Sequence, residues 1–297
     1  MGALLTEAYR LVPPVIFRVT DPISRKWLAR AGNPYLDEID EIAALIGRPG
    51  TYTLNTSFEW GCTCGVGNDP EGGVRLLRVL DWGQQGLGRG LIVLRQKGAA
   101  GDFFSITWPG FVGVATAMAP GRFALALNQP PMRTSGLTMP IGWAAARFDV
   151  WRSRALPPSH LLRQICETCA NYDEARDALL TTPLCLPALV ALGGTEAGQG
   201  CIIERTEHEA ASRALPAAVA NHWVDMPRRG QPRGAASRER QALMEQAVTT
   251  AGPWAAEPII NRDTRLVAAM NPARGLLSVQ GWEREGPVTA LLTLQSS

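Results

Sequence analysis

The middle of the chain alternates short apolar runs with turn residues, a pattern typical of antiparallel strands. Glycine, proline and one Asn-Asp-Pro sequence separate these runs, which favours hairpin connections. We therefore predict an antiparallel sheet of several strands between residues 51 and 128, built from TYTLNTSFEW, VRLLRVLDW, GLIVLRQK, FFSITWP, GFVGVATAM and RFALALN.

Other segments show the 3.6-residue spacing of amphipathic helices. Residues 21–46 predict one or two helices, residues 158–180 a helical hairpin or bent helix that Pro183 ends, and residues 238–248 a further helix. Strands are expected at 13–20 and again in GCIIERT, PAAVANHW, LLSVQGWE and VTALLTLQ. Runs of hairpins with helices between them predict antiparallel sheets covered by helices, an α+β layered sandwich.

Composition narrows the functional classes. The chain has 297 residues, of which 46% are hydrophobic and 19% charged, so it is long and apolar enough to bury a large core. Its net charge is only +2, which gives no field to gather nucleic acid. No signal-like start or long apolar stretch is visible, so we expect one cytoplasmic domain whose six cysteines are free thiols.

One predicted hairpin brings three reactive side chains together. Cys62 begins a strand, and the next strand returns with Arg78 and Asp81. An arginine lowers the pKa of a neighbouring thiol, and a carboxylate holds an ammonium group. On spacing alone, a packed thiol beside a surface ion pair is the simpler interpretation. Cys64 lies two residues along the same strand and is the rival nucleophile.

A cysteine nucleophile also needs a base. The three histidines, His160, His208 and His222, lie far along the chain, and a Cys-His dyad with one of them stays open. The alternative is a cysteine that becomes the first residue, because its own α-amino group, with a pKa near about 7.7–8.0, then takes the thiol proton. That alternative requires cleavage of the bond between Gly61 and Cys62.

The order of several segments resembles one family of enzymes. Arg78 and Asp81 follow Cys62 at intervals of 16 and 19 residues. With PPVIFRVTD, MAPGRFALALN, LLRQICETCANYDEARDALLTTPL, GGTEAGQGCIIER and VANHWVD in the same order, this resembles the N-terminal-nucleophile (Ntn) cysteine hydrolases. The likeness is to the acid ceramidase and N-acylethanolamine acid amidase branch of the choloylglycine hydrolase superfamily, and it runs from about Pro13 to Ala247.

The resemblance implies a four-layer αββα sandwich of two antiparallel sheets flanked by helices. It also implies a chain that cleaves itself before Cys62. Residues 1–61 would form a pro-segment that stays associated with a catalytic domain of residues 62–297. The implied activity is hydrolysis of a linear C–N amide bond in a lipid-like N-acyl amide, through an acyl-thioester on Cys62 and without a cofactor or metal.

Site residues follow from the same resemblance. Cys62 would be the agent of self-cleavage and the nucleophile, with its freed amine as base. Asp81 would hold that amine, Arg78 would stabilise the thiolate, and Asn221 would donate a hydrogen bond to the oxyanion. The later arginine of the family is matched to Arg238, with Arg240 as its competitor. The substrate is expected to contact Trp82 and Asn128. Trp108 and Trp223 are further candidates for an acyl tunnel.

One departure from the family and several alternatives remain. Gln129 stands where relatives carry a glutamate, which argues against acid–base chemistry at that position. A bile-salt or penicillin-V type acylase and an acyltransferase are the enzymatic alternatives, and a lipid-binding module without activity is the third. The arginines between Arg228 and Arg240 would suit transient contact with acidic lipid headgroups, although a solvated loop is the simpler interpretation. The paired cysteines at 166 and 169 lie in a helical pattern, which favours packed thiols over zinc.

Overall fold

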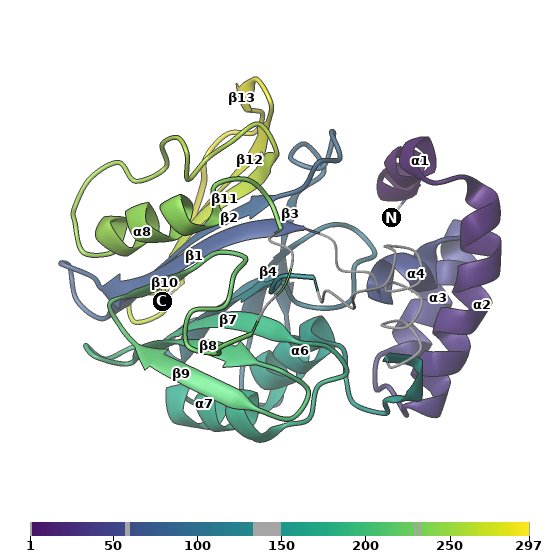
Figure 1. Ribbon diagram of the computed structural model, residues 1–297, viewed down its shortest axis with the longest axis horizontal. Coiled ribbons are helices and arrows are strands. Elements are labelled where there is room, and N and C mark those ends of the chain that lie inside the picture. Colours follow the sequence, from purple (N-terminus) through teal and green to yellow (C-terminus); the bar gives the residue numbers. More distant parts are fainter. Residues whose placement is uncertain (1, 57–59, 133–149, 229, 231–232, 297) are drawn as a thin grey trace.

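Two antiparallel sheets face each other in the structure, a computed structural model that describes residues 2–56, 60–132, 150–228, 230 and 233–296 (Figure 1). The first sheet has the strand order β10-β1-β2-β11-β12-β13, with β14 beside β12. Its strands are β1 (Gly61–Asn68), β2 (Val74–Asp81), β10 (Ala217–Val219), β11 (Thr264–Asn271), β12 (Leu276–Glu283), β13 (Gly286–Pro287) and β14 (Leu292–Gln295).

The second sheet runs in the order β3-β4-β5-β6-β7-β8-β9. Its strands are β3 (Ile92–Gln96), β4 (Phe103–Thr107), β5 (Thr116–Ala119), β6 (Phe123–Asn128), β7 (Ala188–Gly193), β8 (Gly200–Arg205) and β9 (Ala210–Ala214). Apolar side chains from both sheets meet between them and form the main core. The chain crosses from the first sheet to the second after β2 and returns at β10.

Helices cover the outer faces of both sheets (Figure 1). Helix α8 (Ser237–Ala247) packs on β1 and β10, and helices α6 (Pro158–Thr168) and α7 (Tyr172–Thr181) pack on the second sheet. Close approach of α8 depends on glycine, because a Cβ at Gly65 of β1 would lie 2.5 Å from Cγ1 of Val248. The expected αββα sandwich is confirmed, and so is the predicted helical hairpin at 158–180.

Four N-terminal helices lie at one end of the sandwich (Figure 1). They are α1 (Gly2–Leu11), α2 (Pro14–Arg30), α3 (Leu36–Ile46) and α4 (Thr51–Thr56). Trp27 and Ile39 join a buried cluster with Val112, which belongs to the sandwich. Asn33 bonds to His160 of α6 at 2.8 Å. Residues 2–56 therefore pack closely on the rest of the described chain, whereas their release by cleavage after residue 61 stays a prediction.

The structure corrects two of the predicted strands. The segment predicted as a strand at 13–20 lies in α2 from Pro14 onward, with Pro13 as its N-cap, and Pro14 occupies the first turn of the helix, where no backbone donor is needed. Residues 51–56 form α4, which is fixed by the buried Asp21: its Oδ1 atom accepts hydrogen bonds from the amide of Thr53 at 2.9 Å and from its hydroxyl at 2.7 Å. These tertiary contacts override the strand propensity of the β-branched residues.

The sequence analysis also missed strands that the sheets require. Strand β11 lies between β2 and β12, and β7 and β9 belong to the second sheet. Of the segment GFVGVATAM, only the part within Thr116–Ala119 is a strand. No helix in the described ranges is both long enough and apolar enough to span a bilayer.

Candidate active site

Strands β1 and β2 place the predicted residues on two faces of the first sheet. In their antiparallel register, Cys64 lies opposite Arg78, and Gly61 lies opposite Asp81. Because alternate residues share a face, the two thiols and Arg78 point toward the second sheet, whereas Asp81 points toward α8. The Gly61–Cys62 bond joins the first two residues of β1 and so lies next to both sets of side chains.

The Cys62 thiol is fully buried between the sheets. Its sulfur lies 3.7 Å from the carbonyl oxygen of Leu127 on β6. Burial raises the pKa of this thiol to about 12, although the positive charge of Arg78 opposes the rise. In the uncleaved chain the thiol is therefore protonated at neutral pH.

Arg78 is fully buried beside both thiols. Its Nη1 atom donates to the sulfur of Cys64 at 3.0 Å and to Oδ1 of Asn128, and its Nη2 atom donates to the carbonyl of Leu127 at 2.9 Å. These bonds hold the guanidinium under β1, where its charge favours a thiolate. Cys64 donates to Oδ1 of Asn128 at 2.9 Å, and burial raises its pKa as it raises that of Cys62.

Asn221 holds the nitrogen of the Gly61–Cys62 bond. Its Oδ1 atom accepts the backbone N–H of Cys62 at 2.8 Å, and its Nδ2 atom donates to the carbonyl of Gln129 at 2.7 Å. A backbone N–H only donates and a carbonyl only accepts, so these partners fix the orientation of the side-chain amide. Asn221 thus holds the backbone nitrogen of Cys62 in this structure, whereas sequence analysis expected it to donate to an oxyanion.

Asp81 pairs with Arg240, the competitor in the sequence analysis. Nη1 of Arg240 forms a buried ion pair with Oδ2 of Asp81, and the Thr264 hydroxyl donates to Oδ1 at 2.8 Å. Nη2 of Arg240 also lies 3.5 Å from Oδ1 of Asn221. Arg238 is exposed on α8, so the structure brings Arg240 to the site in place of Arg238.

Gly61 lies between the two groups that would receive its neighbour's amine. A Cβ built on Gly61 would stand 3.7 Å from Oδ2 of Asp81 and 3.7 Å from Oδ1 of Asn221. Both oxygens thus lie close to Gly61, the residue whose carbonyl would be attacked. Thr264 is a site residue that sequence analysis missed, because β11 was not predicted.

Asn128 and Gln129 serve the internal network. Asn128 accepts from Arg78 and donates through Nδ2 to the carbonyls of Val219 and Ala220, at 3.1 and 3.0 Å. These bonds occupy both ends of its buried amide, so the structure gives no support to the expected substrate contact. Oε1 of Gln129 accepts the backbone N–H of Trp60 at 3.2 Å, just before the expected cleavage site.

Comparison with known proteins finds sequence relatives for part of the chain. It is 31% identical over 111 residues to the acid ceramidase of Heterocephalus glaber, which covers 37% of this chain and 27% of that protein. Over 108 residues it is 32% identical to the acid ceramidase of Homo sapiens, covering 36% of this chain and 26% of that protein. The chain thus spans about a quarter of the length of these relatives. No protein-family model matches the chain.

A solved structure supports the fold. The Caenorhabditis elegans ortholog of N-acylethanolamine-hydrolyzing acid amidase matches with a TM-score of 0.56 and 19% identity, over 71% of this chain and 93% of that chain. Over the residues of the sequence match, the chain is a homologue of the acid ceramidases. Sequence and fold together confirm the resemblance to Ntn hydrolases of the ceramidase and acid amidase branch.

An aromatic pocket lies beside the candidate cleavage site of this ceramidase homologue. Trp82 packs edge-on against Trp60 and Trp108, with ring centroids 5.4 and 5.8 Å apart. Leu4 of α1 and Leu54 of α4 close the pocket, whose volume is about 20 Å³, room for about one water molecule. The predicted Trp82 and Trp108 therefore meet there, whereas Trp223 does not line this pocket.

None of the three histidines of this homologue bonds to Cys62, although all three lie in the described part of the chain. His160 bonds to Asn33, and burial lowers its pKa to about 3. His222 bonds to Ser237, and His208 is exposed. The alternative of a Cys-His dyad is thereby excluded in this structure. Cys166 is buried in α6, and no cluster of metal-ligating side chains occurs in the described residues.

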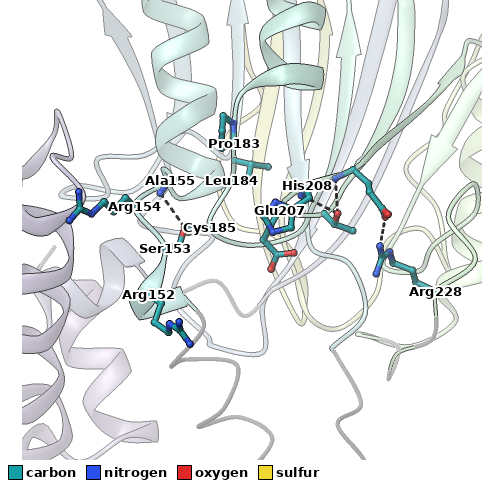
Figure 2. Close-up of a pocket in the computed structure, with 12 residues that line it drawn as sticks. Arg152, Ser153, Arg154, Ala155, Pro183, Leu184, Cys185, Glu207, His208 and Arg228 are labelled. Atoms are coloured by element: carbon teal, nitrogen blue, oxygen red, sulfur yellow. Dashed lines mark hydrogen bonds and ion pairs between the residues drawn. The ribbon is translucent and has the colours of Figure 1, made fainter.

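A larger pocket of about 670 Å³ lies away from these residues (Figure 2). Figure 2 shows Arg228 paired with Glu209 at one side, and Ser153 bonded to the backbone of Ala155 at 3.1 Å on the other. Its lining comprises Arg152, Ser153, Arg154, Ala155, Pro183, Leu184, Cys185, Thr206, Glu207, His208, Glu209 and Arg228. Of these residues, only His208 and Arg228 were considered for a functional role in the sequence analysis, whereas Pro183 was named as a helix end.

Proposed function

We propose that this chain is an amidase that cleaves itself between Gly61 and Cys62 and then hydrolyses the linear amide bond of a lipid-like N-acyl amide. The relatives are named as ceramidases, and the solved neighbour as an amidase of N-acylethanolamines. Ceramides and N-acylethanolamines are both N-acyl amides. One observation carries the proposal. Oδ1 of Asn221 accepts the backbone N–H of Cys62 at 2.8 Å, while the positive charge of Arg78, on the neighbouring strand β2, lies on the face of the sheet to which the Cys62 thiol points.

Self-cleavage follows from this arrangement. The Cys62 sulfur attacks the carbonyl carbon of Gly61, the C–N bond breaks, and the thiol proton ends on the released α-amine. A thioester then joins Gly61 to the sulfur, and water hydrolyses it to a Gly61 carboxylate and a free thiol. Asn221 holds the Cys62 nitrogen while the acyl group moves from this nitrogen to the sulfur. The Asp81 carboxylate then lies close enough to bind the new α-ammonium group.

Amide hydrolysis repeats the same chemistry on a substrate. The α-amine of Cys62 takes the thiol proton, the sulfur attacks the substrate carbonyl, and the leaving amine departs with that proton. Water then releases the acid from the thioester. Arg78 favours the thiolate at the start of the cycle, because its guanidinium is the positive charge that lowers the thiol's pKa.

The aromatic pocket would receive the acyl chain. Trp60 and Trp82 flank the first residue of β1 and the last residue of β2, so the pocket opens beside the scissile bond. About 20 Å³ does not hold a fatty-acyl chain, and Leu4 occupies the space that such a chain needs. Binding therefore requires α1 to move.

A substrate panel tests this proposal. We expect the cleaved chain to release amine from N-acyl amides of increasing acyl length, in a burst equal to the enzyme concentration when deacylation is slow. Cys62→Ala abolishes release, whereas Cys64→Ala, on the same face of the same strand, keeps a measurable rate.

Release of acid and amine together identifies a hydrolase, and transfer of the acyl group to an added amine identifies an acyltransferase. Binding of acyl ligands by an uncleaved chain that releases no amine would contradict the proposal and would identify a lipid-binding module. Preference for bile-salt or penicillin-V amides over lipid-like amides would contradict the proposed substrate class.

A further inference from the structure

The backbone of Asn221 is anchored by a residue that the proposed chemistry does not use. Its N–H donates to the hydroxyl oxygen of Ser237 at 2.9 Å. Ser237 is the first residue of α8, and its hydroxyl also lies 2.8 Å from Nδ1 of His222. All three residues are buried, with exposed fractions of 0% for Asn221, 8% for Ser237 and 7% for His222.

The Ser237 hydroxyl links the backbone of Asn221 to the ring of His222. The Asn221 N–H only donates, so it takes a lone pair of the Ser237 oxygen. The hydroxyl keeps its proton and a second lone pair, so it donates to Nδ1 of His222 or accepts from it, according to the tautomer of the ring. Burial lowers the pKa of His222, and a side-chain hydrogen bond with Gln241 opposes this effect. The positive charges of Arg238, Arg213 and Arg240 also lower this pKa.

The first turn of α8 therefore holds the cleavage site from two sides. Ser237 fixes the backbone of Asn221, and Arg240, three residues later on the same face, pairs with Asp81. Ala236, just before this turn, has φ of 50°, the one positive value among described residues other than glycine. Such a conformation costs free energy in a residue with a Cβ, and it persists only where surrounding contacts over-determine it.

We propose that Ser237 and His222 are positioning residues for self-cleavage. They touch neither the Gly61 carbonyl nor the Cys62 sulfur, and they act by holding Asn221 so that its Oδ1 atom receives the Cys62 N–H. This inference rests on the proposed function, because it assigns the pair a role in the same reaction. A small misplacement of a positioning group lowers a rate by up to about 100-fold.

Two measurements test the pair. The first is hydrogen exchange at the amide of residue 62 in a Cys62→Ala background, which cannot cleave but keeps the backbone N–H. Ser237→Ala should speed exchange at residue 62 about tenfold, while the amide of Val190 in β7 is unchanged. The second is the rate of self-cleavage in freshly translated chain, followed by intact mass.

Conservative variants separate positioning from general damage. Ser237→Ala and His222→Phe should slow self-cleavage by about tenfold or more. Ser237→Thr, which keeps the hydroxyl, and His222→Asn, which keeps an acceptor, should recover most of the rate. His208→Phe, at an exposed histidine, serves as the control and should cleave as wild type does.

Unchanged exchange at residue 62 in Ser237→Ala would overturn the anchoring of Asn221, whether or not the chain cleaves. Faster exchange with wild-type cleavage would overturn the role in the reaction. A wild-type chain that never cleaves would contradict the proposed function and the reaction role together, and exchange would still report whether the pair holds Asn221.

Discussion

At the scale of single residues, the site separates its thiol from its carboxylate. Cys62 and Arg78 face the second sheet, while Asp81 and Arg240 face α8. Asn221 joins the two sides at the end of the strand. In this structure the Cys62 thiol therefore has the cation of Arg78 beside it, and no histidine in the described part of the chain bonds to it. Burial keeps the thiol protonated.

The pH dependence of self-cleavage follows from the Cys62 thiol. Burial raises its pKa to about 12, so the thiolate fraction rises about tenfold per pH unit below that value. We expect the rate of self-cleavage to increase between about pH 6 and pH 9, as measured by intact mass in a pH series. A maximum below pH 6 would contradict this assignment. Since the thiolate is favoured in the unfolded chain, stability should decline as pH rises from about 9 toward 12.

Arg240 and Arg238 provide a matched pair on one helix. Arg240→Met leaves the buried Asp81 carboxylate without its cation, so the free energy of unfolding should fall by about 3–5 kcal/mol. Arg238→Met removes an exposed side chain and should change it by no more than about 0.5 kcal/mol. Urea denaturation of both variants measures the difference, and equal losses would contradict the placement of Arg240.

Sequence analysis could place Cys62, Arg78 and Asp81 at neighbouring positions of one hairpin because its register follows from a short turn, but the structure shows that Asp81 faces the other side of the sheet. It could not choose between Arg238 and Arg240, since that choice depends on the rotation of α8 against β1. Thr264 was missed for another reason: it contacts Asp81 from 183 residues away, and no local pattern encodes such a contact.

At the scale of elements, α1 fills the pocket assigned to the acyl chain. Leu4 lies against Trp60, Trp82 and Trp108, and its carbonyl accepts a hydrogen bond from Gln84 at 3.4 Å. Tyr9 of the same helix donates to the carbonyl of Pro49 and packs on Phe17, and Leu5 is fully buried. Displacement of α1 would open the pocket only if these contacts break.

Shortening Leu4 should open this pocket. Leu4→Ala removes three carbon atoms from the wall of a cavity of about 20 Å³ and so enlarges it. The KM for long-chain N-acyl amides should therefore fall several-fold relative to the KM for short-chain ones. Steady-state kinetics on two acyl lengths measure this ratio. Leu45→Ala, which changes a leucine of α3 that is 86% exposed, is the control. An unchanged ratio in Leu4→Ala would exclude this pocket as the acyl site.

The elements show where local pattern gives way to packing. Most hairpin strands and the helices at 158–180 and 238–248 could be predicted, because their apolar spacing agrees with their final surroundings. Helix α4 could not, since its sequence TYTLNT favours a strand and becomes helical through the side chain of Asp21. Strand β11 is nearly all buried between two neighbours and lacks the alternation that marks a half-exposed strand.

At the scale of the whole molecule, the N-terminal helices are held by the sandwich. Tyr35 donates to Glu167 of α6 at 2.8 Å, and Arg163 of α6 pairs with Glu38 at 2.7 Å. Trp27, Tyr35 and Ile39 are buried in the same contact. None of these interactions depends on the bond between Gly61 and Cys62.

The two fragments should therefore stay together after cleavage. Size-exclusion chromatography under native conditions should give a single species that contains both residues 1–61 and residues 62–297. Denaturant should separate them, because the apolar contacts of Trp27 and Ile39 then lose their driving force. Elution of the shorter fragment alone in native buffer would contradict the association.

The mass of the purified chain under denaturing conditions tests the central claim most directly, since it requires no substrate. Cleavage before Cys62 would divide the 32.0 kDa chain into fragments of about 6.6 and about 25.4 kDa, in proportion to 61 of its 297 residues. The longer fragment should begin with Cys62, and Cys62→Ala should leave one chain. A single 32.0 kDa species at every pH at which the wild-type protein stays folded would contradict self-cleavage and the amidase mechanism built on it.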